Sequence, residues 1–397
     1  MKKNDDPVVI VATQRTPIGQ LQGAFNSFTA AQLGGFAIEG VLKQLDFPAN
    51  DINEVYMGCV LSAGMGQAPA RQAAIGAGVP YSVGATTINK MCGSGMKAMM
   101  LAHDLLVANS ISVALAGGME SMTNAPYLLP KARQGYRMGH TTMYDHMILD
   151  GLEDAYDRGK LMGVFAEKCA EKYGFSREQQ DEYALRSVKL AQLAIEKGYF
   201  KDEITPVNVT SKLGTAIISE DELPGKAMPE KIPNLKPAFK ENGTVTAANS
   251  SAISDGAAVH LLMRQSEAQK RNLKPLATII GHATHSQEPA WFTTAPVEAI
   301  QKCLTKIGWE TKDVDLFEIN EAFAVVAMAA IKSLSLPLEK VNIHGGACVL
   351  GHPIGASGAR IMTTLTYALK QHGLKRGVGA LCIGGGEATA MAIELNG

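Results

Sequence analysis

Residues 92–95 read Cys-Gly-Ser-Gly, and a related stretch, Gly-Ala-Ser-Gly, returns at residues 355–358. Each stretch is followed by an apolar run with helical spacing. A strand-like run then ends in glycines and a glutamate, at residues 117–120 in the first case and 384–387 in the second. This repetition predicts that the chain contains two copies of one α/β scaffold.

The two copies carry different reactive side chains. The first has Cys92 where its helix is expected to begin. The second has His352 in a Gly-His-Pro turn just before its helix and Cys382 in its strand. Glycines at such strand-to-helix turns let the backbone come close to a ligand. This distribution predicts one active site assembled from both copies.

The composition is that of an ordinary globular protein. Of 397 residues, 46% are hydrophobic and 19% are charged, which suits two or three packed domains. The formal net charge is -1, so we expect neither nucleic-acid nor membrane partners. No bilayer-spanning run or leader-like start is apparent, which predicts a cytoplasmic location. Six cysteines without C-x-x-C pairs or zinc-ligand spacing predict free thiols and no metal site.

Strand-like and helix-like segments alternate in both outer thirds of the chain. Such alternation predicts a layered α/β fold with largely buried sheets. The expected strands are residues 8–11, 54–57, 112–116, 259–263, 276–280, 316–318, 341–343 and 379–383. The expected helices are residues 94–109, 297–307 and 322–333.

The middle third, from about residue 125 to 242, is richer in charge and proline and less regular. One helix is clear there, because Ser176 and Gln179 form a capping-box start, an apolar stripe follows, and Gly198 ends it. Prolines between residues 224 and 237 then mark a long loop. We expect an insertion that hangs on the first copy and covers a substrate.

Cys92 and His352 are the leading candidates for chemistry. A cysteine at a helix N-terminus gains thiolate stabilisation from free backbone N–H groups and the helix dipole. A histidine whose backbone is fixed by the following proline suits a base that deprotonates a thiol. The alternatives are a small cysteine that packs as a hydrophobe and a hydrogen-bonded histidine in a tight turn.

Cys382 and Asn320 have weaker claims on residue type alone. Cys382 lies in an apolar strand, so it is either a core residue or a second acid/base beside the first thiol. Asn320 lies where a strand ends and a helix begins, so it can cap the helix, hold a water or ligand, or do both. The other four cysteines are expected to be structural, and no motif places His282 or His285.

Taken together, these segments resemble the thiolase family over essentially the whole chain. The resemblance rests on the ordered boxes at residues 66–72, 92–95, 117–122, 320–323, 351–353 and 382–386. It implies the thiolase fold: an α/β protein of duplicated layered halves, in five layers α-β-α-β-α, with an inserted loop domain. The implied division is residues 1–124 plus 243–273 for the N-terminal half, 125–242 for the insertion, and 274–397 for the C-terminal half.

The resemblance also implies a mechanism. Cys92 becomes acylated, His352 takes its proton, and Cys382 exchanges a proton with the α-carbon of the acetyl unit. One oxyanion hole would use His352 and a water held by Asn320. The second would use the backbone N–H groups of Cys92 and Gly384. Preorganised donors of this kind stabilise the enolate that a Claisen condensation needs.

Several positions match the family's coenzyme A contacts: Ser251, Met162, Phe239, Ala247, Ala322 and Phe323. Leu161 stands where biosynthetic members usually have histidine, which makes the pocket more apolar. Phe292 is found in members that accept 2-methyl-branched substrates. The Gly384-Gly385-Gly386 ending and the loop of residues 125–150, which resembles a tetramerisation loop, favour the short-chain branch.

The resemblance therefore implies an acyltransferase, an acetyl-CoA C-acetyltransferase that interconverts two acetyl-CoA with acetoacetyl-CoA and CoA through acetyl-Cys92. It implies CoA thioesters as substrates without a further cofactor, a role in fatty-acid metabolism, and a homotetramer built as a dimer of dimers. The enzyme alternative is a 3-ketoacyl-CoA thiolase of fatty-acid β-oxidation with broader chain length. A catalytically silent acyl-CoA-binding protein and a decarboxylating condensing enzyme are the further alternatives.

Overall fold

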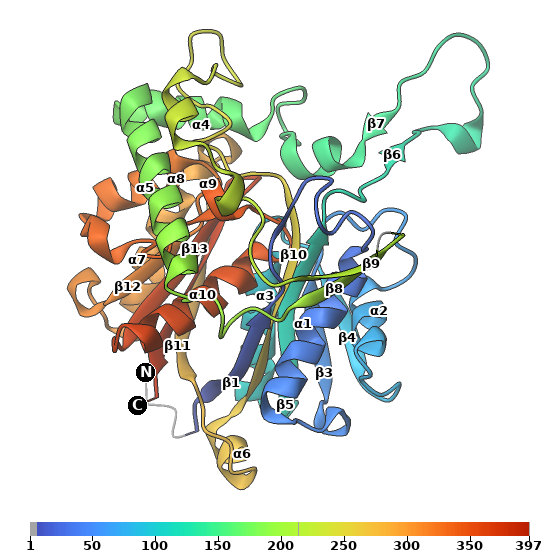
Figure 1. The fold of residues 1–397 in the computed structure, drawn as a ribbon, viewed down its shortest axis with the longest axis vertical. Helices are drawn as coiled ribbons and strands as arrows, with labels where there is room; N and C mark the ends of the chain where they lie inside the picture. Colours follow the sequence, from blue (N-terminus) through green and yellow to red (C-terminus); the bar gives the residue numbers. More distant parts are fainter. Residues whose placement is uncertain (1–5, 213, 397) are drawn as a thin grey trace.

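The computed structural model describes residues 6–212 and 214–396, and within them one mixed sheet runs through the body of the protein (Figure 1). The strands of this sheet are β1 (Val8–Arg15), β2 (Gly19–Gln20), β3 (Glu54–Gly58), β4 (Gly84–Ile88), β5 (Val113–Ser121), β10 (Ser254–Arg264), β11 (Ala277–Ser286), β12 (Leu316–Ile319), β13 (Arg376–Ile383) and β14 (Glu387–Leu395). Their order is β12-β13-β14-β11-β1-β10-β5-β3-β4, with β2 beside β10.

The sheet repeats one arrangement twice, as the sequence predicts. In the first half β3 is parallel to β5, and β10 is antiparallel to β5. In the second half β12 is parallel to β13, and β14 is antiparallel to β13. The halves meet where β1 pairs with β11, at Val9 with Thr278 and Ile10 with Ala277.

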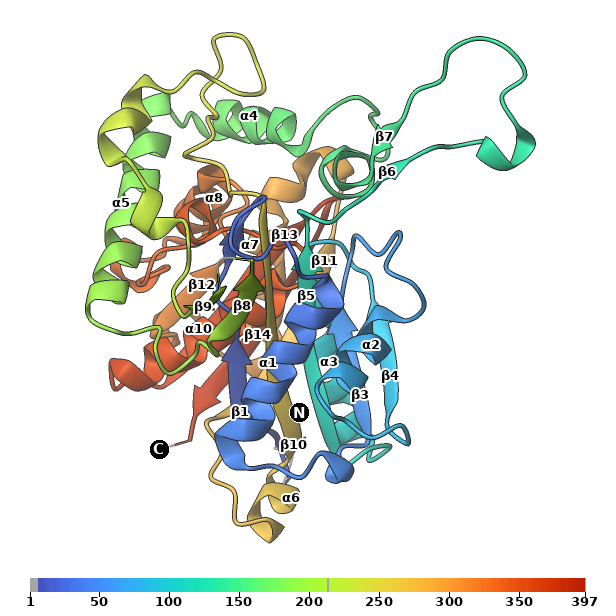
Figure 2. The same cartoon turned by 45° about the vertical axis from the view of Figure 1, so that its right-hand side comes forward.

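The two halves of the sheet form two β layers, with helices between them and on both outer faces (Figure 1, Figure 2). This arrangement of five layers, α-β-α-β-α, confirms the predicted architecture. Helices α1 (Ala30–Leu45) and α2 (Pro69–Gly76) cover the outer face of the first half, and α7 (Ala295–Ile307) and α8 (Ala324–Leu334) cover the outer face of the second. Helices α3 (Ser94–Val107) and α10 (Ser357–Gln371) form the middle layer. Met99 and Met362, which the repeat aligns, are both buried in the core of that layer.

Glycines let α3 and α10 touch at their first turns. A Cβ added at Gly95 would lie 2.9 Å from the amide nitrogen of Ala359, and one at Gly358 would lie 2.5 Å from that of Met96. Carbon atoms cannot approach amide nitrogens that closely without overlap. The glycines that mark the repeat in the sequence are therefore the residues that bring its two copies together.

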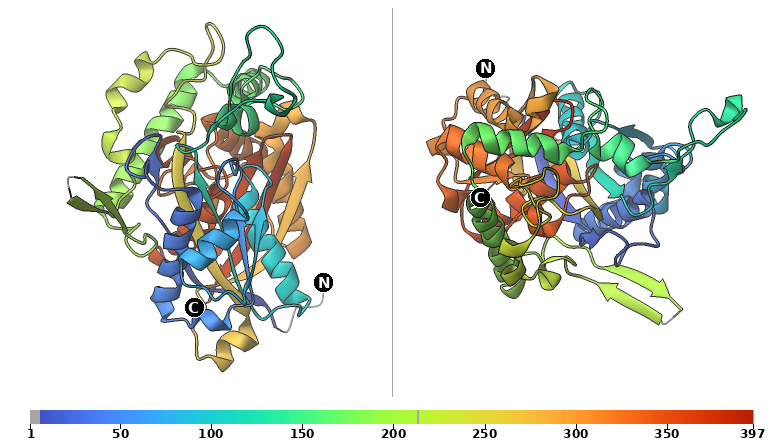
Figure 3. Two further views of the ribbon diagram at one scale, coloured as in Figure 1. Left: turned by 90° about the vertical axis from the view of Figure 1, so that its right-hand side faces the viewer. Right: turned by 90° about the horizontal axis from the view of Figure 1, so that it is seen from above.

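The insertion lies over one end of this body. It contains α4 (Met162–Tyr173), α5 (Arg177–Glu196) and the strands β8 (Val207–Ser211) and β9 (Gly214–Ile218). Strands β6 (Tyr127–Leu128) and β7 (Tyr144–Asp145) form the base of an arm that extends away from the body (Figure 2, Figure 3). Two short helices, α6 (Gln265–Lys270) and α9 (Ala347–Leu350), complete the α-helices of the described residues. The division of the chain into three numbered domains stays a prediction.

Local signals in the sequence are confirmed where capping decides the element. The Ser176 side chain accepts a hydrogen bond from the amide of Gln179, and the Gln179 side chain accepts one from the amide of Ser176, so α5 begins at the predicted box. The predicted strand at residues 341–343 is wrong, because this segment makes only isolated bridges. Asn342 has a φ of 48°, in the left-handed region that a strand cannot contain.

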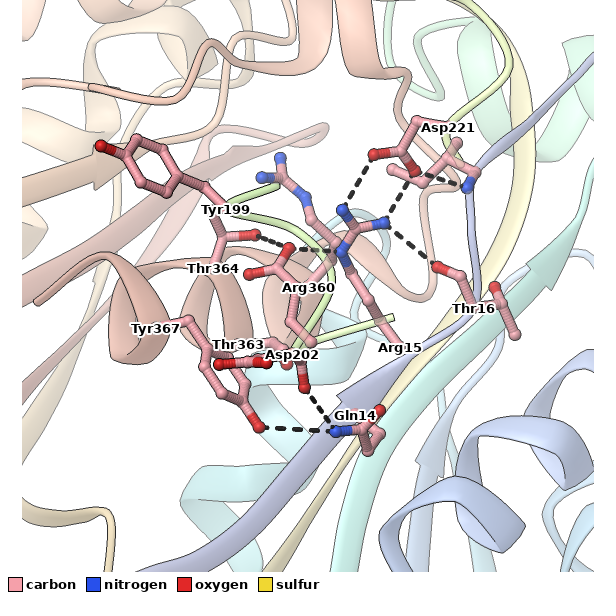
Figure 4. Close-up of polar contacts among 12 residues, drawn as sticks. Gln14, Arg15, Thr16, Tyr199, Asp202, Asp221, Arg360, Thr363, Thr364 and Tyr367 are labelled. Carbon is pink, nitrogen blue, oxygen red and sulfur yellow. Dashed lines mark hydrogen bonds and ion pairs between the residues drawn. The ribbon is translucent and has the colours of Figure 1, made fainter. Parts of the chain in front are cut away.

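Arg15 on β1 ties the insertion to the first half (Figure 4). Its guanidinium is fully buried and donates to Glu203 at 2.6 Å and to both oxygens of Asp221 at 2.7 and 2.8 Å. Burial alone would lower the pKa of Arg15, but the two carboxylates raise it above its ordinary value. Thr364 on α10 also donates to Glu203, at 3.1 Å, so the second half shares this anchor. None of the helices in the described ranges has the length and hydrophobicity of a membrane span.

The substitution Gly358→Ala tests the helix contact. We expect it to lower the free energy of unfolding by about 1–3 kcal/mol or more, because the new methyl group overlaps the backbone of Met96. Gly76→Ala is the matched control, since Gly76 ends α2 and a Cβ there would meet no atom within 4 Å. The control should change stability by less than about 1 kcal/mol. Urea unfolding of both variants measures their free energies of unfolding. Equal losses of stability would contradict the conclusion that Gly358 is required for the close contact between α3 and α10.

Candidate active site

Cys92 lies in a tight turn at the start of α3. Met91, just before it, has a φ of 46°, which is uncommon for a residue with a side chain. The Ser94 hydroxyl holds this turn, because it accepts from the amide of Lys90 at 2.8 Å and donates to the carbonyl of Met91 at 2.6 Å. A strained turn that is held on both sides fixes the position of the Cys92 side chain.

The Cys92 thiol is neutral in the resting site. Burial raises its pKa to about 11, and hydrogen bonds from the backbone N–H groups of Gly384 and of Cys92 itself oppose that rise. The expected stabilisation by the helix N-terminus is thus outweighed by burial, so the thiol needs a base. The two N–H groups at the sulfur are the pair that the resemblance to the thiolase family implies for an oxyanion hole.

His352 is held as a neutral base. It is buried, and its Nδ1 lies 2.5 Å from the Ser357 hydroxyl, which donates its own proton to the carbonyl of Pro353 at 2.9 Å. Ser357 must therefore accept from Nδ1–H, which leaves Nε2 with the free lone pair. Burial and the positive charge of Arg360 lower the pKa of His352 to about 3. The imidazole is accordingly uncharged at neutral pH.

Asn320 lies against His352 rather than capping a helix. Its Nδ2 is 3.4 Å from Nδ1 and 3.5 Å from Nε2 of the imidazole. Helix α8 begins at Ala324 with Phe323 as its N-cap, so the N-cap prediction for Asn320 is wrong. Among the described residues, the buried Oδ1 of Asn320 has no hydrogen-bond partner. A buried amide with a free acceptor fits the alternative role of holding a water or ligand.

Cys382 belongs to the second half of the chain, but its thiol lies close to Cys92 of the first half. Burial raises the pKa of its thiol well above the ordinary value, and the nearby Cys92 thiol raises it further. A Cβ added at Gly93 would lie 2.3 Å from the side chain of Ile383, so the Cys92 turn packs directly on β13. The structure thus brings the two predicted thiols together.

Two buried carboxylates position the turns around the site, and the sequence-based analysis does not identify them. Glu120 at the end of β5 accepts from the amides of Val60, Leu61 and Gly355, at 2.9–3.1 Å. Burial raises the pKa of Glu120 to about 7, although these hydrogen bonds oppose the rise. Glu321 accepts from the Ser187 hydroxyl at 2.8 Å and from the amide of Cys348 at 3.1 Å, which joins α5 to the turn before His352. Their only sequence signal is a glutamate three or four residues after the end of a predicted strand.

Most of the predicted coenzyme A contacts share one apolar cluster with Cys382 and Phe292. Its members from that prediction are Met162, Phe239, Ala322 and Phe323. The rings of Phe239 and Phe323 lie 6.0 Å apart, and the amide of Ser251 donates to the carbonyl of Ala322 at 2.9 Å. Ala247 is exposed and lies outside this cluster. Leu161 is the half-buried N-cap of α4 and offers no side-chain hydrogen bond there.

Comparison with known proteins agrees with this geometry. Residues 8–266 match the family described as "Thiolase, N-terminal domain", and residues 273–395 match "Thiolase, C-terminal domain". The chain therefore belongs to the thiolase family.

Several similar relatives are named acetyl-CoA acetyltransferase, and relatives from Staphylococcus aureus that are 45% identical to this chain are named "Probable acetyl-CoA acyltransferase". The chain is 50% identical to "Acetyl-CoA acetyltransferase 2" of Arabidopsis thaliana, over 99% of this chain and 98% of that one. It is 47% identical to "Probable acetyl-CoA acetyltransferase" of Dictyostelium discoideum, over 99% and 95%. Among solved structures, the acetyl-CoA acetyltransferase of Bacillus anthracis superposes with a TM-score of 0.96 at 40% identity, over 98% of this chain and 99% of that one.

Ser357→Ala tests the positioning of His352. Without the acceptor at Nδ1 the imidazole loses its fixed tautomer, so we expect the rate of Cys92 acetylation to fall at least about tenfold and its pH profile to shift. The matched control is Thr366→Val, which removes a buried hydroxyl of the same helix that bonds the carbonyl of Met362 at 2.8 Å. A loss of activity without a changed pH profile, or equal losses in both variants, would show that Ser357 acts only in packing.

Proposed function

We propose that the protein is an acetyl-CoA C-acetyltransferase that catalyses the reversible condensation of two acetyl-CoA to acetoacetyl-CoA and CoA. The observation that carries this proposal is the pair of neighbouring thiols, Cys92 and Cys382, in a site that also holds a neutral imidazole, His352. A nucleophile, a base and a second acid/base are the groups that an acyl transfer followed by a Claisen step requires. The names of the similar relatives support the same activity.

In the first step, Nε2 of His352 takes the proton of Cys92, and the sulfur attacks the acetyl carbonyl. The carbonyl oxygen becomes an oxyanion, which the N–H groups of Cys92 and Gly384 stabilise. CoA then leaves as a thiolate and takes its proton from Cys382. Because burial raises the pKa of Cys382, the resulting thiolate is a strong base.

In the second step, the Cys382 thiolate removes a proton from the methyl carbon of another acetyl-CoA. The enolate oxygen that forms accepts hydrogen bonds from the protonated Nε2 of His352 and from a water held by Asn320. The enolate carbon attacks the carbonyl of acetyl-Cys92, and the thiolate of Cys92 leaves. Acetoacetyl-CoA is released, and the proton of His352 returns to Cys92.

The apolar cluster around Cys382 limits the size of the acyl group that the site can bind. Phe292 is almost fully buried and lies with its ring 6.5 Å from that of Phe165. Two aromatic rings beside the reacting carbon favour a short acyl group. Phe292 matches the phenylalanine of family members that accept 2-methyl-branched substrates, which supports tolerance of an added methyl branch. The alternative, a 3-ketoacyl-CoA thiolase for longer chains, requires the rings to move.

The arm of residues 126–145 supports the proposed homotetramer. Its large apolar side chains are exposed to solvent: Tyr127, Leu129, Tyr136, Met138, Met143 and Tyr144. Met138 is 95% exposed, which is unfavourable unless another chain covers it. Light scattering, which measures the mass of the particle in solution, tests this assembly. We expect the mass of a tetramer for the wild type and a smaller mass for Met138→Asp.

The proposed setting is the cytoplasm and fatty-acid metabolism. All six cysteines are free thiols, which suits a reducing compartment. The reaction as written is complete with CoA thioesters, so no further cofactor is proposed.

Variants of the two thiols separate the two steps. Mixed with acetyl-CoA, Cys382→Ala should still gain one acetyl group by intact mass but should lose condensation by at least about a hundredfold. Cys92→Ala should gain none. Cys169→Ala is the matched control, since this buried thiol belongs to the same apolar cluster and should leave both steps intact. No acetyl adduct on the wild type would support a catalytically silent acyl-CoA-binding protein instead.

A chain-length series in the thiolysis direction separates the two enzymatic alternatives. We expect kcat/KM to be highest for acetoacetyl-CoA and to fall at least about tenfold for longer 3-ketoacyl-CoA substrates, because each additional methylene must fit against Phe292. The 2-methyl derivative should retain activity. Rising activity beyond four carbons would contradict the proposed function and favour the longer-chain thiolase.

A further inference from the structure

Three side chains that play no part in the reaction above converge where α3 meets β11. His103 and Asp104 lie near the end of α3, and His282 lies on β11 of the second half. His103 Nδ1 is 3.1 Å from Asp104 Oδ1, and His282 Nε2 is 3.2 Å from the former and 3.0 Å from the latter. In the described part of the chain, this is the group of His, Cys, Asp or Glu side chains whose possible ligand atoms lie close enough together to bind one metal ion.

Protons satisfy this triangle in one arrangement only, in which both ring nitrogens carry a proton and both N–H groups donate to Asp104 Oδ1. If one ring nitrogen carries no proton, its lone pair faces the carboxylate oxygen, and the two acceptors repel each other. A single cation at the centre satisfies all three atoms, because each then presents a lone pair to positive charge.

The group is open to solvent on one side. The His282 side chain is 9% exposed and that of Asp104 is 57% exposed, which leaves an open path for an ion and its waters.

The separations also fit. Ligand atoms about 2.1 Å from one ion lie about 3.0 Å apart on an octahedral face and about 3.4 Å apart on a tetrahedral one. The observed separations of 3.0–3.2 Å fall between these values. Two imidazoles and one carboxylate are ligands that first-row divalent transition metals share.

We propose that His103, Asp104 and His282 form a binding site for a divalent transition metal ion such as Zn²⁺, with water completing the coordination. The ion joins α3, which begins beside Cys92, to a strand of the second half. It therefore stabilises the folded arrangement of the two halves by mass action rather than taking part in acyl transfer. Lys306 weakens the site, because its ammonium donates to the carbonyl of His282 at 3.2 Å and places a positive charge nearby.

Titration of the metal-stripped native oligomer with Zn²⁺ tests the proposal. We expect one ion per chain at this site and a higher unfolding temperature when zinc is bound. His282→Gln should weaken that binding at least about a hundredfold, since even loss of a group behind a metal ligand commonly costs ten- to a hundredfold. His285→Gln is the matched control, because this histidine lies on the same strand and bonds Gln287 and Lys302 instead. Lys306→Gln should tighten binding.

Cobalt spectroscopy separates this site from the active-site thiols. Co²⁺ bound by His103, Asp104 and His282 gives visible bands without the strong charge-transfer band of a cobalt–thiolate bond. Asp104→Asn, at a largely exposed position, repeats the test should His282→Gln fold poorly. Zinc binding that persists unchanged in both variants, or cobalt bound through thiolate alone, would overturn the proposal.

Discussion

The contact between the first turns of α3 and α10 is the constraint on which the rest of the structure depends. Next to these turns, the end of β5 meets the segment just before α10 equally closely. A Cβ added at Gly118 on β5 would lie 2.0 Å from the carbonyl oxygen of Gly355, and one at Gly355 would lie 2.7 Å from Glu120. Only bare backbone allows the two halves to approach this closely. Because reactive groups stand at the start of each helix, this approach also brings Cys92 and His352 to the same end of the middle layer.

Burial then sets the chemistry of the resting site. It raises the pKa of both thiols and lowers that of His352, so every group is uncharged until a substrate arrives. Backbone N–H groups oppose this rise in pKa at both thiols: those of Gly384 and Cys92 at the Cys92 sulfur, and that of Cys382 at its own sulfur. Each copy of the repeat also uses its serine to position a reactive group. Ser94 holds the turn of Cys92, and Ser357 sets the tautomer of His352.

The sequence alone identifies what local chemistry determines. The capping box of α5, the glycine turns and the reactive side chains were all predictable, because each depends on neighbours in the chain. Asn320 was placed correctly at the end of a strand, but its helix starts four residues later because Phe323 takes the extended N-cap conformation. The alanine-rich strand β14 has only two β-branched residues, Thr389 and Ile393, so its pairing with β11 and β13 defines it more than its composition does.

Groups that meet across the fold were beyond such prediction. Glu120 becomes a positioning residue only once Gly355 lies beside it. His103 and His282 are separated by 179 residues and share no motif. Spacing rules for metal ligands apply to ligands on one local element, so they cannot find a site made from a helix of one half and a strand of the other.

The central claim is that one chain supplies the whole site, with the nucleophile from its first half and the acid/base from its second. Mixed oligomers of a Cys92→Ala chain and a Cys382→Ala chain, purified through two different tags, test this claim directly. Neither chain then holds both thiols, so the account predicts no condensation above that of the separate variants. Recovery of a substantial fraction of wild-type activity in the mixed oligomer would contradict it, because the two thiols would then have to meet between chains.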